Sequence, residues 1–213
     1  MLRLALAAPR RWASSCVLRR PSPSAPRECP TPLLFVSAKG WDADSYRGYH
    51  LDTLTTTLSF KGFTCMHCDL SLRAPAPLDS TKIMNHFVAD LKSQLRLTMH
   101  TVSFPPVIFA RSSASLIAQA YIGSNPATAM MLTGAIPSTN ADVPQALLPT
   151  RLEEFNFEPK FPIALLTTAH EMERLRKTNR LAQAPEVDLF TTHDLESQDA
   201  LLKIEGWLDD LGI

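Results

Sequence analysis

Short apolar runs alternate with stretches of helical periodicity along this chain, and that alternation constrains the fold more than any other feature. Apolar runs predict six buried strands, at residues 32–38, 63–70, 105–110, 127–135, 161–169 and 187–192. Helical patterns fill the intervals, with the clearest at residues 44–62, 171–184 and 195–212 and another beginning at Ser80, which we expect to cap it. The pattern predicts an α/β fold with a mostly parallel six-stranded sheet and helices on both faces.

The chain has 213 residues, of which 45% are hydrophobic, as in an ordinary globular protein. This length predicts one domain, over residues 32–213. Residues 136–160 are rich in proline and predict a short irregular lid segment, with a possible short helix near 143–148. No apolar run approaches the roughly 20 residues that span a bilayer, so we expect no transmembrane segment.

The N-terminal residues have a composition of their own. Six of the 21 basic residues, all arginines, lie in the first 32 positions, together with only one of the 21 acids. Such an arginine-rich, serine-bearing, acid-poor stretch predicts a mitochondrial transit peptide at residues 1–31, disordered or partly helical, and a location in the mitochondrial matrix. Cleavage could fall near Trp12 to Ser15 or later, before Thr31, and a disordered basic tail is the alternative.

The body that follows carries a net charge of −5 and no basic stripe. Nucleic-acid binding needs a surface that neutralises phosphates, so we expect no nucleic-acid partner.

Two of the four cysteines form a C-x-x-C pair, Cys65 and Cys68, while Cys16 and Cys29 lie in the predicted leader. On a helix this spacing could make a redox pair. Here it lies in a predicted strand, where residues three apart point to opposite faces. We therefore expect two buried, inert thiols. No histidine pair has the helical spacing of a zinc site, and we expect neither a metal nor a cofactor.

A serine, a carboxylate and a histidine stand where three predicted strands end. Ser112 follows the third strand, Glu171 the fifth and His193 the sixth. Functional side chains of parallel sheets gather at the carboxyl ends of the strands, so we expect these three to meet. His50, His67, His86 and His100 are scattered and are expected to be structural.

This arrangement resembles the α/β-hydrolase fold, whose serine, acid and histidine follow one another in that order. The resemblance covers residues 32–213, without the antiparallel strands that usually lead the sheet. The segment "LLFVSAKGWDADSY" is similar to the family's first recognisable strand and its oxyanion turn. "VIFARSSASLIAQAY" is similar to the nucleophile elbow, "PIALLTTAHEMERL" to the strand that delivers the acid, and "VDLFTTHDLESQDALLKIEGWLDDL" to the ending that delivers the histidine.

The elbow needs small residues two positions before and two after the nucleophile, because strand and helix approach closely there. Framed on Ser112, these positions are Ala110 and Ala114, whereas framing on Ser113 would place an arginine in the turn. The resemblance therefore implies that Ser112 is the nucleophile.

The resemblance also implies roles for the other site residues. His193 would be the general base and Glu171 its partner, with Asp142 as a rival acid. The backbone N–H groups of Ser113 and Trp41 would form the oxyanion hole.

The implied function is a serine hydrolase that cleaves a carboxylic ester or thioester through an acyl-serine intermediate. The small-molecule substrate would enter an open site, because the lid is short; the oligomeric state is left open. Because alanine replaces both glycines of the elbow, an alternative function is a catalytically inactive binding or interaction protein of the same fold. A flavodoxin-like domain is a weaker third reading, because "SAKGWDADS" has a single glycine.

Overall fold

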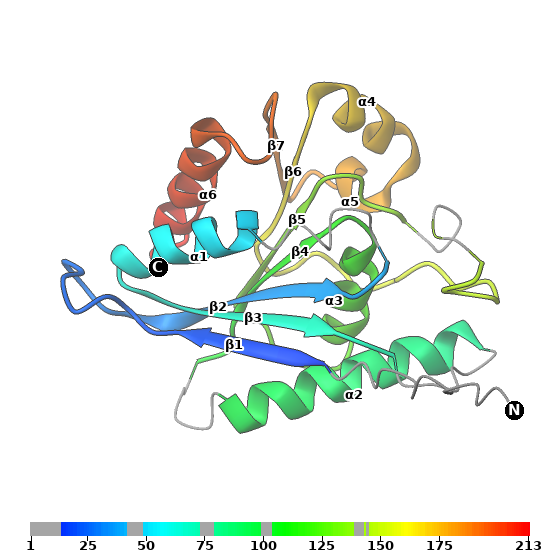
Figure 1. Cartoon of the computed structure of the whole chain (residues 1–213). Helices are drawn as coiled ribbons and strands as arrows, with labels where there is room; N and C mark the ends of the chain where they lie inside the picture. The colour runs from blue at the N-terminus through cyan, green and yellow to red at the C-terminus, as the bar shows by residue number, and fades with distance from the viewer. Residues whose placement is uncertain (1–13, 42–48, 73–78, 99–103, 139–142, 144) are drawn as a thin grey trace, which may run out of the picture.

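The structure, a computed structural model, describes residues 14–41, 49–72, 79–98, 104–138, 143 and 145–213 (Figure 1). Its centre is a seven-stranded sheet in the order β1-β3-β2-β4-β5-β6-β7, in which β1 is antiparallel to β3 and every other neighbouring pair is parallel. The strands are β1 (Ser15–Arg19), β2 (Cys29–Ala38), β3 (Phe63–Leu70), β4 (Val107–Arg111), β5 (Ala129–Thr133), β6 (Ile163–Thr167) and β7 (Val187–Thr191).

Helices connect β2 to β3, β3 to β4, β4 to β5 and β6 to β7, as the sequence predicted, and a last helix follows β7. They are α1 (Tyr49–Phe60), α2 (Ser80–Thr98), the short 3-10 helix η2 (Ser112–Ala114), α3 (Ser115–Ile122), α4 (Ala169–Thr178), α5 (Arg180–Gln183) and α6 (Gln198–Asp210). The single helix expected at 171–184 is broken at Asn179, whose backbone is extended and whose side chain caps α5 by accepting from the N–H of Leu181. Residues 145–147 form a turn rather than the helix expected near 143–148.

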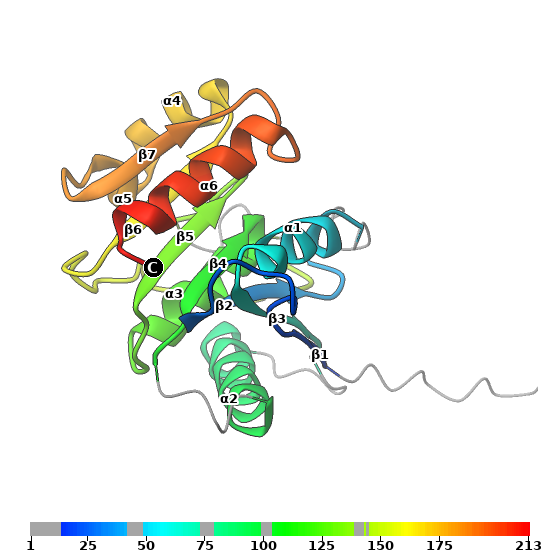
Figure 2. The same ribbon diagram turned by 90° about the vertical axis from the view of Figure 1, so that its left-hand side faces the viewer.

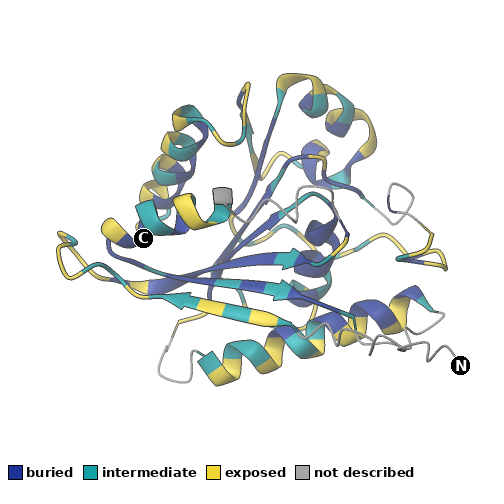
Figure 3. Cartoon of the chain, viewed as in Figure 1, coloured by how far each residue is buried: buried dark blue, intermediate teal, exposed yellow. Residues whose placement is uncertain are grey.

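Alternate residues of the strands face two separate cores. One core packs against α2, α3, α4 and α5 and includes Leu34, Ile108 and Leu165 from the strands. The other packs against α1 and α6 and includes Phe35, Phe109 and Leu166. Figure 2 shows α1 and α6 on the side of the sheet away from α2 and α3. Figure 3 shows that the central strands are buried, and burial on both faces explains why β4 and β6 are apolar up to their last residues.

The strand β1 corrects the sequence-based prediction. The expectation of six strands without an antiparallel leading strand is wrong, because Ser15–Arg19 pairs with β3 at the sheet edge. The signal was missed because this strand is short, only partly buried, and lies in the arginine-rich segment predicted as a leader. The transit peptide stays a prediction, and residues 1–13 lie outside the described residues.

The cysteines also differ from the prediction. Cys68 is joined to Cys16 by a disulfide that ties β1 to β3, so it is not an inert thiol. Cys65 is a buried free thiol, as expected, and burial raises its pKa to about 12.

The segment 136–160 has no helix or strand among its described residues. Leu148 and Leu152 are buried in the core on the α2 side of the sheet. Thr150 exchanges hydrogen bonds with Ser80, so Ser80 does not cap α2; Asp79 does, by accepting from the N–H of Lys82. No helix in the described part of the chain is long and apolar enough to cross a membrane.

Candidate active site

The turn from β4 into η2 holds Ser112 in a strained backbone conformation. Its φ of +50° makes Ser112 the one non-glycine residue with positive φ in the described part of the chain. This left-handed region costs a residue with a Cβ roughly 1–2 kcal/mol. Ala110 and Ala114, two positions to either side, are both buried. The predicted elbow geometry around Ser112 is thus present, with alanine methyl groups accommodated where glycine is usual.

The Ser112 hydroxyl faces the end of the neighbouring strand β5. There Gly134 has φ +80°, and a Cβ added to it would lie 3.0 Å from Ser112 Oγ. The Ser112 hydroxyl makes no hydrogen bond to any residue that the structure describes. It is half-buried and is available to a ligand.

A pocket of about 260 Å³ lies beside Ser112, over the carboxyl ends of the strands and between α1 and α6. Its walls are mainly apolar and include Phe35, Leu51, Leu54, Phe109, Leu195, Leu201 and Ile204. Arg111 and Glu196 line it as an ion pair of 3.5 Å, and Ser37 and Thr57 add hydroxyl groups. No described residue of 136–160 lines this pocket, so a lid over it stays a prediction.

His193 follows β7, at the carboxyl end of the sheet as predicted, but its side chain is exposed and does not line the pocket. No hydrogen bond joins it to Ser112 or Glu171, all three being described residues. His193 lies near Asp199 in the first turn of α6. Hydrogen bonds from Lys203 and Thr192 lower the pKa of Asp199, and the charge of His193 lowers it further by a smaller amount.

Glu171 is held in the first turn of α4. Its N–H donates to Thr168 Oγ1, and its carboxylate accepts two hydrogen bonds from Arg174, of 3.0 Å to Nε and 2.6 Å to Nη2. The spacing T-x-x-E is that of a capping box, but only its first half is present: Thr168 accepts from the Glu171 N–H, while the Glu171 carboxylate pairs with Arg174. The structure therefore brings Glu171 to Arg174 and not to His193. The rival acid, Asp142, lies outside the described residues.

The two predicted oxyanion donors differ. Ser113 follows Ser112 at the start of η2 and is buried, in the position that the prediction requires. The N–H of Trp41 instead donates to the carbonyl of Ala38 at 3.2 Å, closing a turn, and its ring packs edge-on against Phe87. The structure thus gives the Trp41 N–H a partner other than a ligand.

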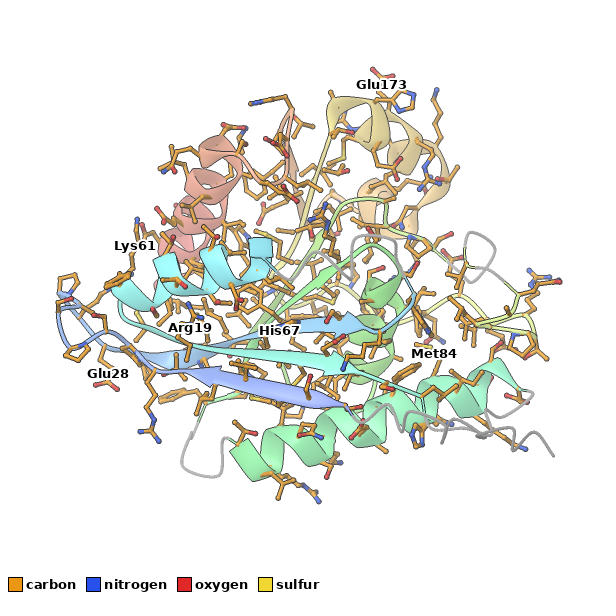
Figure 4. All side chains as sticks on the ribbon, viewed as in Figure 1. Arg19, Glu28, Lys61, His67, Met84 and Glu173 are labelled. Atoms are coloured by element: carbon orange, nitrogen blue, oxygen red, sulfur yellow. A yellow bond between two sulfur atoms is a disulfide. The ribbon has the colours of Figure 1, made fainter. Side chains whose placement is uncertain are left out.

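Sequence reasoning missed a polar cluster on β2 and β3. Ser37 Oγ lies 3.0 Å from Asp69 Oδ1 and 2.9 Å from His67 Nε2 (His67 is labelled in Figure 4). Burial lowers the pKa of His67 below 6.5, while the charges of Asp69 and Asp52 oppose the shift. His67 and Asp69 stand two apart on β3 and thus on one face, but only the pairing register opposite Ser37 reveals the cluster.

Within the described residues, no group of three His, Cys, Asp or Glu side chains could hold a metal ion. The pocket is lined by hydroxyl groups, the Arg111–Glu196 ion pair and mainly apolar side chains.

Several solved structures of hydrolases are similar to this chain. An esterase from the Planctomycetes species Thermogutta terrifontis, with butyrate bound, aligns at a TM-score of 0.63 and 11% identity, covering 93% of this chain and 90% of that one. Est1E from Butyrivibrio proteoclasticus with ferulic acid aligns at 0.60 and 13%, covering 93% and 95%. An α/β hydrolase from a metagenome of Mar Chica lagoon sediments, Morocco, aligns at 0.60 and 10%, covering 94% and 96%.

These alignments show that the chain has the α/β-hydrolase fold; at such identities they show nothing about activity. No protein-family model matches the sequence, and no curated protein matches it either.

Proposed function

We propose that this protein is a serine hydrolase that cleaves a carboxylic ester or thioester, with Ser112 as the nucleophile. The observation that carries the proposal is the strained elbow: a serine at φ +50° between strand and helix, whose hydroxyl lies at the edge of a pocket and bonds to none of the described residues. Strain of this kind persists where surrounding structure enforces it, and such residues cluster at active sites. A serine serving only as a helix cap would not need it.

The proposed reaction has two steps. Ser112 Oγ attacks the carbonyl carbon, its proton passes to His193, and the leaving alcohol or thiol takes that proton. Water then attacks the acyl-serine with the same base. The Ser113 N–H lies at the start of the helix, where it could stabilise the oxyanion. Because His193 is exposed in the structure, the proposal requires its loop to approach Ser112 when substrate binds.

The pocket supports a small apolar acyl or alcohol group as the substrate's main body. A cavity of roughly 150 Å³ already holds benzene, so about 260 Å³ suits a short chain or a single substituted ring. Butyrate and ferulic acid, seen in two of the similar structures, fall in this size range. A mitochondrial location is part of the proposal and rests on the N-terminal composition alone.

The second candidate is a non-catalytic binding protein with the same pocket. The Glu171–Arg174 ion pair and the occupied N–H of Trp41 favour it, because both remove groups that the triad scheme would use.

Covalent labelling of the full-length chain distinguishes the two candidates. A fluorophosphonate probe reacts only with an activated serine, so wild-type protein should be labelled while Ser112→Ala and His193→Ala are not. Ser37→Ala is the matched control, since it removes another hydroxyl of the same pocket and should keep the label. A folded wild-type protein that takes no label would rule out the hydrolase and leave the binding protein.

A further inference from the structure

We propose that Ser37 is a recognition site for a hydroxyl group of the ligand, so that this pocket prefers an apolar molecule bearing an alcohol or phenol. The inference rests on the proposed function for the location of the pocket but not for turnover. Ser37 lines the same pocket as Ser112, yet comes from β2 and belongs to the Ser37–His67–Asp69 cluster.

The side chains of this cluster hold one another in place. Ser37 and Asp69 are direct partners in the parallel pairing of β2 and β3, and His67 is one pleat earlier on β3, opposite Phe35. All of them point to the α1 side of the sheet. Asp69 also lies 3.6 Å from the ammonium of Lys39, and its side chain is only 18% exposed. The Ser37 hydroxyl is therefore fixed from two directions.

The positions of the protons follow from the two contacts. A serine hydroxyl has one hydrogen to donate and two lone pairs to accept with. Asp69, paired with Lys39, can only accept, so the Ser37 hydrogen points to Asp69 Oδ1. His67 Nε2 must then carry a hydrogen and donate it to Ser37 Oγ. The hydrogen bonds thus form a series in which His67 donates to Ser37 and Ser37 donates to Asp69.

Among the described residues, this assignment leaves Ser37 with one unused lone pair and no hydrogen to give. Since Ser37 lines the pocket, that lone pair can be satisfied by a donor on the ligand. A pocket group that can only accept discriminates between a ligand with a hydroxyl and the same ligand without it.

The donor on the ligand is assigned as a neutral hydroxyl rather than an ammonium. The cavity walls around it are mainly apolar, and the nearby charges are already paired, Asp69 with Lys39 and Arg111 with Glu196. Bringing a further charge into such a site carries a desolvation cost that a hydroxyl avoids.

The test compares binding of ethyl 3-phenylpropanoate with that of its 2-, 3- and 4-hydroxyphenyl analogues. Calorimetry is done in the full-length Ser112→Ala protein, which cannot form an acyl-serine. We expect the best hydroxylated isomer to bind about tenfold more tightly than the parent ester, as one hydrogen bond allows. Adding Ser37→Ala should reduce the ratio to below about twofold, and adding Ser37→Thr, which keeps the hydroxyl, should restore it.

Thr57→Val serves as the matched control, because Thr57 lines the same pocket and its hydroxyl already donates to the carbonyl of Thr53. It should keep the tenfold ratio. Equal binding of all the esters, a ratio unaffected by Ser37→Ala, or no binding of any ester overturns the inference. Fluorophosphonate labelling of wild-type Ser112 is measured separately. A preference for the hydroxylated ester without labelling contradicts only the proposed hydrolase, and labelling without that preference contradicts only this inference.

Discussion

Two serines of one pocket are held in opposite ways. Ser112 has a strained backbone and a hydroxyl that bonds to no described residue, whereas Ser37 lies in a regular strand with its hydroxyl between His67 and Asp69. The backbone strain at Ser112 lowers the stability of the fold, whereas the two hydrogen bonds of Ser37 raise it. If Ser112 is the nucleophile, as proposed, a hydrogen-bonded Ser–His–Asp set does not by itself mark one, and the strained backbone is the better indicator.

The largest expected difference between the two serines is in catalysis. With a p-nitrophenyl ester that has no hydroxyl on its acyl group, Ser112→Ala should lower kcat/KM by at least about 10³-fold. Ser37→Ala should lower it by less than about tenfold, because this ester has no hydroxyl group for Ser37 to recognise. Equal losses in the two variants would show that the comparison assigns the roles wrongly.

The disulfide at the sheet edge allows stability to be changed without touching either serine. Reducing Cys16–Cys68, which closes a loop of 52 residues, should lower the free energy of unfolding by about 4 kcal/mol. Urea unfolding with and without dithiothreitol measures the loss. The Cys16→Ser variant should show no further change with reductant. Fluorophosphonate labelling of the folded protein should be unaffected, since the disulfide joins β1 and β3 rather than the elbow.

Gly134 supports the strained serine, so Gly134→Ala should damage the elbow selectively. The new Cβ would sit at φ +80° and 3.0 Å from Ser112 Oγ, which we expect to cost about 1–3 kcal/mol and to abolish labelling. Gly206→Ala is the control, because among the described residues the added Cβ would meet no atom within 4 Å beyond its chain neighbours and the backbone of helix α6 itself; it should stabilise the protein by about 0.5–1 kcal/mol. Normal labelling of Gly134→Ala would contradict a crowded elbow.

Stability should respond to the two serines with opposite signs. Ser112→Gly relieves the positive φ and should raise the free energy of unfolding by about 1 kcal/mol. Ser37→Ala leaves Asp69 without its donor and should lower it by about 1–2 kcal/mol. Chemical denaturation of both variants measures the two free energies of unfolding. Changes of the same sign would contradict the distinction between a strained Ser112 and a hydrogen-bonded Ser37.

The smallest effect concerns pH. Burial lowers the pKa of His67 in the folded state below 6.5, so the unfolded chain binds a proton first as the pH falls. Stability should therefore decrease as the pH drops below about 6.5, by less than about 1.4 kcal/mol per pH unit from this residue. His67→Gln should remove that part of the slope. An unchanged slope in the variant would show that other groups are responsible.

Much of the fold and only part of the site followed from the sequence. The six apolar strands were predicted because burial on both faces leaves uninterrupted apolar runs, and Ser112 because the elbow tolerates only small neighbours. The antiparallel β1 was not predicted, because a half-exposed edge strand carries no such run.

Side-chain direction accounts for the remaining differences. Glu171 and His193 do stand at strand ends, but the carboxylate of the first pairs with Arg174 three residues further along α4, and the second is exposed. Neither outcome is visible in the order of residues along the chain, and the same holds for the Ser37 cluster, which depends on the register of β2 and β3.

The disulfide-linked strand β1 limits where the N-terminal segment could be cleaved. If the N-terminal segment is an import signal, a protease that cuts before Thr31 would remove Cys16 and leave β3 with an open edge, a template for joining other chains. A cut near Trp12 would spare the strand. Only the earlier of the two expected cleavage points is therefore compatible with the fold. Once the disulfide forms, residues around Cys16 stay covalently attached to the domain, whereas a cleaved leader separates from it.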